Sequence, residues 1–153
     1  MDYFLYFYVI FQIFFAFLLG GFIGYEREKH GIGAGIRTYA AVSMGAAIFT
    51  IVGNNLMDMQ GASRMVSNVI TGVGFLGAGI IFKDAQQQRA TGLTTASTIW
   101  ATSAVGVAVG YKLYPIAVFS ALALYFLLAL DDYKWYKNWR DRLKRKMEEE
   151  QQS

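Results

Sequence analysis

Hydrophobic residues form five long runs that are separated by short polar segments. The runs cover 3–25, 38–57, 65–82, 90–111 and 113–130, and none of them contains Asp, Glu, Lys or Arg. A helix that crosses a bilayer needs about 20 mostly apolar residues. The alternative, a soluble helical protein, would show polar stripes at helical period on its surface helices. The pattern therefore predicts an all-α integral membrane protein with five transmembrane helices.

Basic residues are distributed unevenly among the polar segments. Twelve of the 14 Lys and Arg residues lie in 26–37, 83–89 and 131–153, and the other two are Arg64 and Lys112. Because basic residues favour the cytoplasmic side of short loops, we expect the N-terminus outside and the C-terminus in the cytoplasm. The run 3–25 starts without a basic residue and ends in a poor cleavage site, so we expect a retained helix rather than a signal peptide.

The composition changes near Asp131, where hydrophobic sequence gives way to charged sequence. We therefore expect a five-helix transmembrane domain over 1–131 and a basic amphipathic cytoplasmic tail over 132–153. One face of a helix in this tail would carry Trp135, Tyr136, Trp139, Leu143 and Met147, which is typical of a helix that lies in the membrane interface. A frayed basic tail that only sets the topology is the alternative.

Small residues mark surfaces where helices can approach each other closely. Gly20 and Gly24 form one such pair, and Ala41 with Gly45 forms another. The longer series Thr102, Gly106, Gly110, and the Ala41 and Gly45 pair as a shorter version of it, are better interface candidates than Gly20 and Gly24. By the same reasoning, we predict that Gly72, Gly74, Gly77 and Gly79 form a helix-packing motif. Three of its glycines match G-x-G-x-x-G, but the motif lies in mid-span with no acidic residue about 20 positions later, which disfavours a dinucleotide site.

Hydroxyl and amide side chains are concentrated in two of the predicted helices. Asn68 and Thr71 lie in the third helix, and the fourth carries Thr94, Thr95, Ser97, Thr98, Thr102 and Ser103. Each hydroxyl taken alone can bond a carbonyl of its own helix. Their density predicts a polar seam between these two helices, either a solvated path or interhelical hydrogen bonding, and we favour the second.

The ionisable residues at the ends of the spans are the candidates for binding a ligand or partner. They are Glu26, Arg27, Arg37 and Arg64, with Asn68 as a polar partner, and Glu26 and Arg37 are expected to pair. The alternative is that these side chains are snorkelling anchors. Glycines 31, 33 and 35 can expose backbone N–H groups beside the first three, which suits an anionic ligand or an acidic partner surface. Arg64 would lie on the other side of the membrane as a structural anchor.

Several kinds of chemistry are disfavoured by what the sequence contains. There is no cysteine and only one histidine, His30, which lies in a glycine-rich loop. No nucleophile has the base partner that covalent catalysis requires, and no carboxylate cluster suits an octahedral magnesium site. We therefore expect no enzyme, no catalytic residue, no cofactor and no metal site. A nucleic acid is not an expected partner.

Five blocks of sequence together resemble the membrane domain of the MgtC/SapB family. They are Gly20–Arg27, Ala34–Thr38, Ser63–Arg64, Gly72–Gly79 and Gly92–Trp100, in the family's order. Two features depart from the family. Members commonly place Arg directly before the Gly-Leu of the last block, whereas Arg89 is separated from it here by Ala90 and Thr91. Many members also continue into a soluble C-terminal domain, so the chain looks like a short form or a membrane-domain piece.

The resemblance implies a multi-pass protein of the bacterial inner membrane that is tied to growth in low magnesium and, in pathogens, to virulence. Family members are thought to act by binding other membrane machinery, including the F-type ATP synthase. We therefore expect a small membrane regulator that forms a homodimer or small homo-oligomer. The alternative is a transporter of magnesium, potassium or a small solute, formed by a homo-oligomer.

Overall fold

The computed structural model describes residues 3–31, 33–83 and 90–151, and almost all of them are helical. The helices are α1 (Tyr3–Lys29), α2 (Ile36–Leu56), α3 (Met59–Ile80), α4 (Leu93–Gly110), α5 (Tyr114–Ala129), the short 3-10 helix η1 (Leu130–Asp132) and α6 (Lys134–Gln151). Two short strands, β1 (Phe82–Lys83) and β2 (Ala90–Thr91), lie between α3 and α4. The all-α membrane fold is confirmed.

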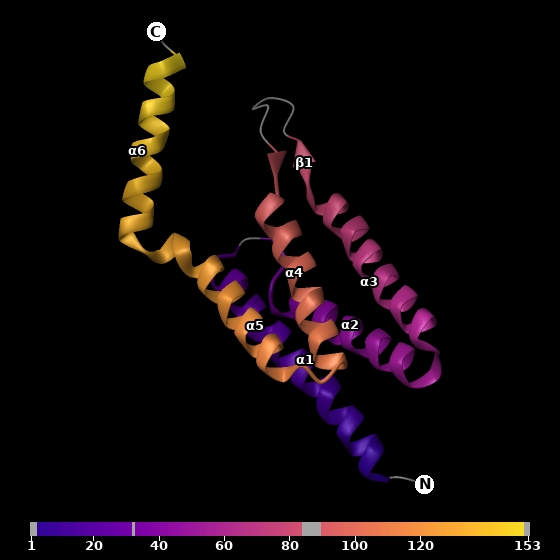
Figure 1. The fold of residues 1–153 in the computed structure, drawn as a ribbon. Helices are drawn as coiled ribbons and strands as arrows, with labels where there is room; N and C mark the ends of the chain where they lie inside the picture. The colour runs from indigo at the N-terminus through magenta and orange to yellow at the C-terminus, as the bar shows by residue number, and fades with distance from the viewer. Residues whose placement is uncertain (1–2, 32, 84–89, 152–153) are drawn as a thin grey trace.

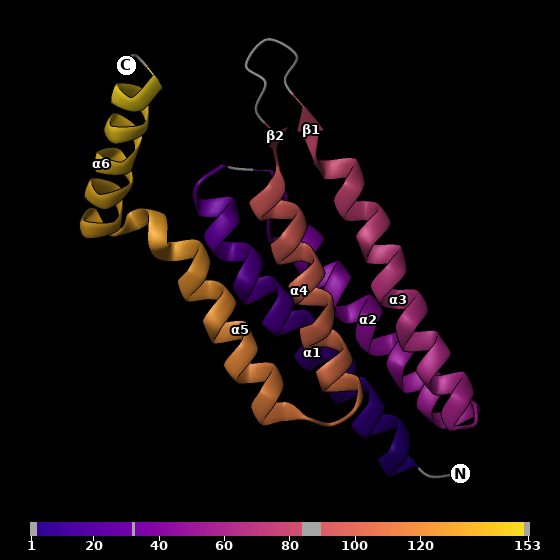
Figure 2. The same ribbon diagram turned by 45° about the horizontal axis from the view of Figure 1, so that its top comes forward.

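Helix α4 lies at the centre of the bundle and packs against α1, α2, α3 and α5 (Figure 1). The α1–α2 connection, the two strands and α6 lie at one end of the bundle, which we call the loop end (Figure 2). The N-terminus, the α2–α3 turn and the α4–α5 turn lie at the other end. The predicted grouping of the basic segments agrees with this arrangement, whereas the side of the membrane that each end faces stays a prediction.

Four of the five predicted spans have the length and hydropathy of a membrane-crossing helix. These are α1, α2, α4 and the segment Tyr114–Asp132, which includes α5. Helix α3 has 22 residues, but Arg64, Asn68 and five glycines lower the hydrophobicity of its sequence. A helix of that length extends about 33 Å. A fifth span through α3 therefore stays a prediction.

The ends of two predicted spans differ from the structure because a small β-hairpin replaces helix there. Phe82 pairs with Thr91 and Lys83 pairs with Ala90 in antiparallel register. Gly92, with a φ of +84°, then turns the chain into α4. The predicted span 90–111 therefore begins three residues late, at Leu93, and α3 ends at Ile80. Residues 84–89 of the predicted polar hairpin, including Arg89, lie outside the described residues.

Glycine lets α2 lie in close contact with both α1 and α4. A side chain at Gly20 would lie 2.5 Å from the Tyr39 carbonyl oxygen of α2, and one at Gly110 would lie 2.6 Å from Thr50 Cβ. Any side chain at Gly106 would collide with the Ser43 carbonyl oxygen. Both small-residue series of α1 and α4 are therefore helix contacts, as predicted. A side chain at Gly45 would meet no atom within 4 Å, so the Ala41 and Gly45 pair makes no such contact within the chain.

The polar seam lies between α4 and α2 rather than between α4 and α3. Thr98 and Thr102 are buried and share the face of α4 that carries Gly106 and Gly110, both of which contact α2. Thr71, Thr94 and Ser97 are exposed. The hydroxyls of Thr98, Thr102 and Ser103 donate to carbonyls of their own helix. The period of a helix explains the difference, since only one face of α4 can point toward α3.

Helix α6 leaves the bundle at η1 and projects away from it (Figure 2). Its apolar face is exposed at Trp135, Trp139 and Leu143, with Trp135 64% accessible. The structure does not describe the side chain of Met147. A helix therefore forms in the tail, and its placement in the membrane interface stays a prediction.

Candidate functional site

The last turn of α1 brings charged side chains to the loop end of the bundle. The helix ends where Gly31 takes a φ of +62°, a left-handed conformation that glycine adopts without strain. The N–H of Gly31 donates to the Glu28 carbonyl over 3.0 Å. This termination places Glu26, Arg27, Lys29 and His30 beside the start of α2 and the end of α5.

Glu28 anchors the start of α2 and so positions Arg37. Its Oε2 accepts a hydrogen bond from the backbone N–H of Ile36 over 2.7 Å, which satisfies a helix N-terminus that has no capping side chain of its own. Arg37 follows directly and is exposed. Together with Glu28 and Thr38 it lines a hollow of about 470 Å³.

Arg27 links the end of α1 to the start of α4. Its Nη2 donates to Thr95 Oγ1 over 2.5 Å. Its Nε is buried and has no hydrogen-bond partner. Arg27 also lines a cavity of about 740 Å³ at the loop end, with Thr94, Thr95 and Asp131 among the other lining residues. A guanidinium side chain that lines a cavity is suited to an anionic group.

Hydrogen bonds beneath this cavity hold α2 and α4 in register. The Thr98 hydroxyl donates to the Thr94 carbonyl over 2.7 Å. Tyr39 OH lies 2.6 Å from Thr98 Oγ1, and since that hydroxyl uses its hydrogen on Thr94, Tyr39 is the donor of this bond. Both Tyr39 and Thr98 are buried. Thr98 lies one turn along α4 from Thr94 and Thr95, which line the cavity, so bonded side chains lie next to it inside the bundle.

Glu26 is buried at the loop end but does not form the predicted pair with Arg37. Its side chain is only 1% exposed, and its Oε1 lies 3.6 Å from both Lys29 Nζ and His30 Nδ1. Neither carboxylate oxygen has a hydrogen bond of good geometry. Helical spacing explains the difference, because Lys29 and His30 lie one turn after Glu26 on the same face, whereas Arg37 belongs to another helix.

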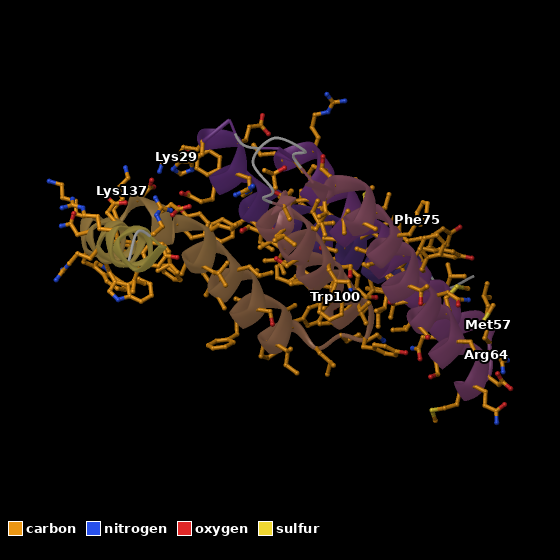
Figure 3. All side chains as sticks on the ribbon, turned by 90° about the horizontal axis from the view of Figure 1, so that it is seen from above. Lys29, Met57, Arg64, Phe75, Trp100 and Lys137 are labelled. Atoms are coloured by element: carbon orange, nitrogen blue, oxygen red, sulfur yellow. The ribbon has the colours of Figure 1, made fainter. Side chains whose placement is uncertain are left out.

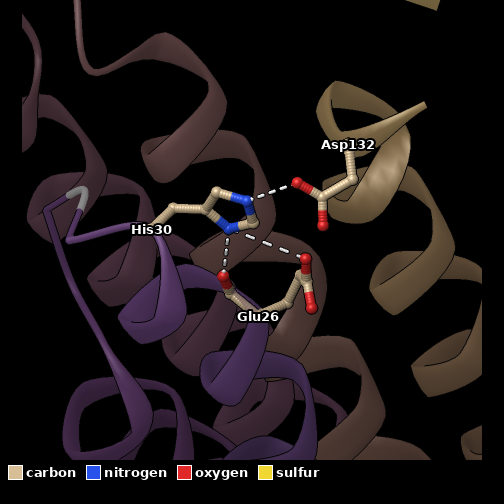
Figure 4. Close-up of side chains that lie close together, drawn as sticks. All are labelled: Glu26, His30 and Asp132. Atoms are coloured by element: carbon tan, nitrogen blue, oxygen red, sulfur yellow. Dashed lines mark hydrogen bonds and ion pairs between the residues drawn. The ribbon is translucent and has the colours of Figure 1, made fainter. Parts of the chain in front are cut away.

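His30 connects the end of α1 to η1 (Figure 4). Its Nδ1 lies 2.8 Å from the Glu26 carbonyl oxygen and its Nε2 lies 2.7 Å from Asp132 Oδ1. Lys29 Nζ contacts the other oxygen of Asp132 over 2.8 Å. The hydrogen bond to the Glu26 carbonyl, and then the bond to Asp132, raise the pKa of His30 above its ordinary value. We call Glu26, His30 and Asp132 the carboxylate–histidine cluster.

Arg64 and Asn68 lie apart from this group. Both are exposed on α3, and Arg64 lies at the opposite end of the molecule from Lys29 (Figure 3). Asn68 lines an apolar groove of about 530 Å³ between α2 and α3. The structure therefore brings Glu26, Arg27 and Arg37 to one end and leaves Arg64 at the other, as predicted.

The glycine block of α3 is mostly open. A side chain at Gly77 would lie 3.6 Å from Ala96 Cβ of α4, whereas positions 72, 74 and 79 have no atom within 4 Å. Within the chain, this block was predicted to pack against α4 or a second protomer, and only Gly77 contacts α4; contact with a second copy stays a prediction. The other three glycines leave a smooth face on this helix.

Sequence reasoning missed Lys29, His30 and Asp132 as a group. The four-residue spacing of Glu26 and His30 was a readable signal that they share a helix face. Asp132 could not be found in this way, because it lies 102 positions from His30 and only the packing of α5 against α1 brings it close. Gln12, which is buried among apolar side chains, was also missed.

The fold and the loop-end site can now be compared with known proteins. The model of the MgtC family matches residues 13–134. The chain belongs to the MgtC family. Protein MgtC of Brucella abortus (strain 2308) is 42% identical over 116 residues, which is 76% of this chain and 47% of that protein. Protein SrpB of Synechococcus elongatus is 37% identical over 136 residues, covering 81% of this chain and 74% of SrpB.

A third member of the family is named "Putative magnesium transporter YhiD", from Escherichia coli (strain K12). It is 37% identical over 127 residues, which is 78% of this chain and 58% of YhiD. The chain spans about half the length of the MgtC relatives that it matches. No solved structure matches the chain. The family and the relatives' names support a magnesium-related membrane protein.

Proposed function

We propose that this protein is a small regulator of the bacterial inner membrane, linked to magnesium homeostasis and, in pathogens, to virulence. It acts by binding other membrane machinery such as the F-type ATP synthase, and it catalyses no reaction. Membership of the MgtC family supports this proposal, because relatives carry the name MgtC or a name that refers to magnesium.

The docking surface for a partner is the loop end. The observation that carries this assignment is Arg27, whose guanidinium side chain lines a cavity of about 740 Å³ at this end. Arg37 adds an exposed positive charge at the same end. Two guanidinium groups so placed attract an acidic surface or an anionic group of a partner, since guanidinium forms strong paired bonds with carboxylate.

The loop end faces the cytoplasm in this proposal. The support is the distribution of basic residues, since Arg27, Arg37 and α6 with its Lys and Arg residues share that end. A partner would then contact this protein through its own cytoplasmic loops or within the membrane. Arg64, at the other end, has no part in docking and serves as an anchor.

A second copy of the chain covers the open face of α3 in this proposal. Positions 72, 74 and 79 would allow close approach of another helix, and the groove between α2 and α3 is lined almost entirely by apolar groups. In lipid, such small-residue faces favour association because backbones can pack closely. We therefore propose that the protein forms a homodimer or a small homo-oligomer.

The second candidate function is transport of magnesium, potassium or a small solute by such an oligomer. The name of the relative YhiD favours it. Against it, the five charge-free segments contain no carboxylate, although ion paths in membranes are commonly marked by intramembrane ionisable groups. Regulation by binding is therefore the better supported function.

The docking surface is tested by growth in low magnesium. A bacterium that lacks its own MgtC-family protein is given the wild-type chain or the variants Arg27→Lys, Arg37→Ala, Glu26→Ala and Arg64→Ala. Arg27→Lys keeps the charge but removes Nε, and Arg37→Ala removes an exposed group, so both should abolish growth support at normal protein levels. Glu26→Ala should also abolish growth support at normal protein levels.

Two controls separate docking from stability. Thr95→Ala removes the bond partner of Arg27 without removing the guanidinium, so growth support should largely remain. Arg64→Ala should lower the amount of folded protein, and growth should fall only in proportion. If Arg27→Lys and Arg37→Ala also reduced growth only in proportion to lost protein, the loop end would not be a docking surface.

A further inference from the structure

The carboxylate–histidine cluster combines three groups that ligate metal ions. Glu26, His30 and Asp132 each place one ligand atom within 4.8 Å of the other two. They come from the last turn of α1, the turn after it and η1 (Figure 4). A site of this kind requires more than proximity, because carboxylates gather on many surfaces without binding an ion.

Glu26 supplies an independent reason to expect a cation. Its carboxylate is buried and points into the cluster, and neither oxygen has a hydrogen bond. Burying a carboxylate is costly unless it is paired or coordinates a metal. The contacts at 3.6 Å to Lys29 and His30 are longer than hydrogen bonds. The ion pairs to Lys29 and His30, and the nearby Tyr125 side chain, do not give the Glu26 oxygens a well-formed hydrogen bond, so a metal ion could still bind them.

The orientation of His30 points to the same conclusion. The Glu26 carbonyl can only accept, so Nδ1 must carry the hydrogen of that bond, and the neutral ring then has its lone pair at Nε2. Nε2 lies 2.7 Å from a carboxylate oxygen of Asp132. Without a metal ion this short distance requires a charged imidazolium whose Nε2–H donates to Asp132, and a metal ion would take the place of that proton. A backbone carbonyl that fixes the ring through Nδ1 is also the usual support of a histidine that ligates through Nε2.

Lys29 occupies the space that such a cation would take. Its Nζ lies 2.8 Å from Asp132 Oδ2 and 3.6 Å from Glu26 Oε1, so it contacts both carboxylates. Its side chain is half exposed, and long exposed lysine side chains move easily. Asp132 is 41% exposed, which leaves an entry path for an ion and for the water that completes its coordination.

We propose that Glu26, His30 and Asp132 bind a divalent transition-metal ion that ties the end of α1 to η1 and so fixes the base of α6. One imidazole with two carboxylates suits Zn²⁺ or Mn²⁺, whereas Mg²⁺ favours oxygen ligands and retained water. Ligands about 2.1 Å from tetrahedral zinc lie about 3.4 Å apart. On binding, His30 Nε2 and Asp132 Oδ1, now 2.7 Å apart, would therefore separate, and any wider distance, at most 4.8 Å, would shorten. Glu26 is also one of the residues tested for docking, whereas His30 and Asp132 are not, so variants at His30 and Asp132 test the metal site alone.

The proposal is tested by calorimetric titration of the purified full chain in detergent, after removal of any affinity tag, with ZnCl₂ and with MgCl₂. The chain has no cysteine and no second histidine, so few other groups compete for zinc. We expect one equivalent of Zn²⁺ to bind, and Mg²⁺ to bind far more weakly. His30→Ala and Asp132→Asn should each weaken zinc binding by at least about tenfold to a hundredfold, the loss seen when even an outer partner of a ligand is removed.

Two further variants make the test specific. Asp141→Asn removes an exposed carboxylate of α6 and should leave zinc affinity unchanged. Lys29→Gln removes the competing ammonium and should strengthen zinc binding, which a simple charge cluster without a metal would not do. Zn²⁺ should also raise the melting temperature of the wild type but not that of Asp132→Asn. Equal zinc affinity in the wild type, His30→Ala and Asp132→Asn, or no zinc binding by the wild type, would overturn the proposal.

Discussion

The side-chain amide of Gln12 in α1 donates to the carbonyl oxygen of Val109 in α4, over 2.9 Å and 97 positions of sequence. It also reaches the carbonyl of Gly110 at 3.3 Å. These carbonyls belong to the last turn of α4, where backbone donors are scarce, and the Val109 carbonyl also accepts from the backbone N–H of Lys112 over 2.9 Å. A buried glutamine thus satisfies the end of the central helix.

Replacing Gln12 with Leu should destabilise the bundle. The apolar side chain fills similar space but takes the side-chain donor away from Gly110, whereas Val109 keeps the N–H of Lys112. A buried group left unsatisfied costs about 1–3 kcal/mol. The unfolding midpoint in detergent, followed by circular dichroism, measures the loss. Thr71→Ala is the control, because that exposed hydroxyl bonds only to its own helix. Equal midpoints for both variants would show that the Gln12 bonds contribute nothing.

Two glycine-to-alanine changes should have opposite effects. Gly106→Ala places a methyl group against the Ser43 carbonyl oxygen, and overpacking of this kind costs about 1–3 kcal/mol. Gly45→Ala meets no atom within 4 Å and should be neutral or stabilise by about 0.5–1 kcal/mol through reduced backbone freedom. Chemical denaturation of both variants checks the signs. A loss of stability in both would mean that the α2–α4 contact is not specific.

The open face of α3 predicts a variant that affects assembly without affecting the fold. Gly74→Leu adds a bulky side chain where the chain itself offers no contact, so the monomer should fold normally and the oligomer should weaken. Gly77→Leu, beside Ala96, should instead destabilise the monomer. Size-exclusion chromatography with light scattering, together with thermal melts, separates the two effects. Unchanged oligomeric state in Gly74→Leu would mean that this face contacts lipid.

The orientation in the membrane can be measured with single cysteines, because the chain has none of its own. We expect an impermeant maleimide to label intact cells at Gln60→Cys, which lies at the end opposite the loop end. Gly31→Cys, Gln87→Cys and Ser153→Cys should react only after the cells are opened. External labelling at position 31 or 153 would reverse the proposed orientation.

The sequence predicted the helices well because each is a long run without charge. It also predicted the contacts of Gly20, Gly24, Gly106 and Gly110, since small residues four positions apart share a helix face. It failed where the outcome depended on which helices become neighbours. The hydroxyls of α4 were assigned to α3 rather than α2, and Asp132 was not connected to His30, because pairwise packing over 100 positions leaves no local pattern.

Local patterns also misled at the helix ends. Ala90 and Thr91 continued an apolar run, yet they pair with β1, and Gly92 starts α4 in a left-handed conformation. The expected pair of Glu26 and Arg37 was chosen because they border the same loop. The turn at Gly31 brings Lys29 and His30 closer to Glu26 instead.

Regulation by binding, rather than transport, is the central claim, and flux into liposomes tests it most directly. Purified full chain is reconstituted at a known density into liposomes that contain a magnesium or potassium indicator, and an added ionophore confirms that the indicator responds. The account predicts that entry of either ion equals that of protein-free liposomes. Saturable entry that depends on the protein and is lost in Arg27→Lys would contradict it and establish the transporter.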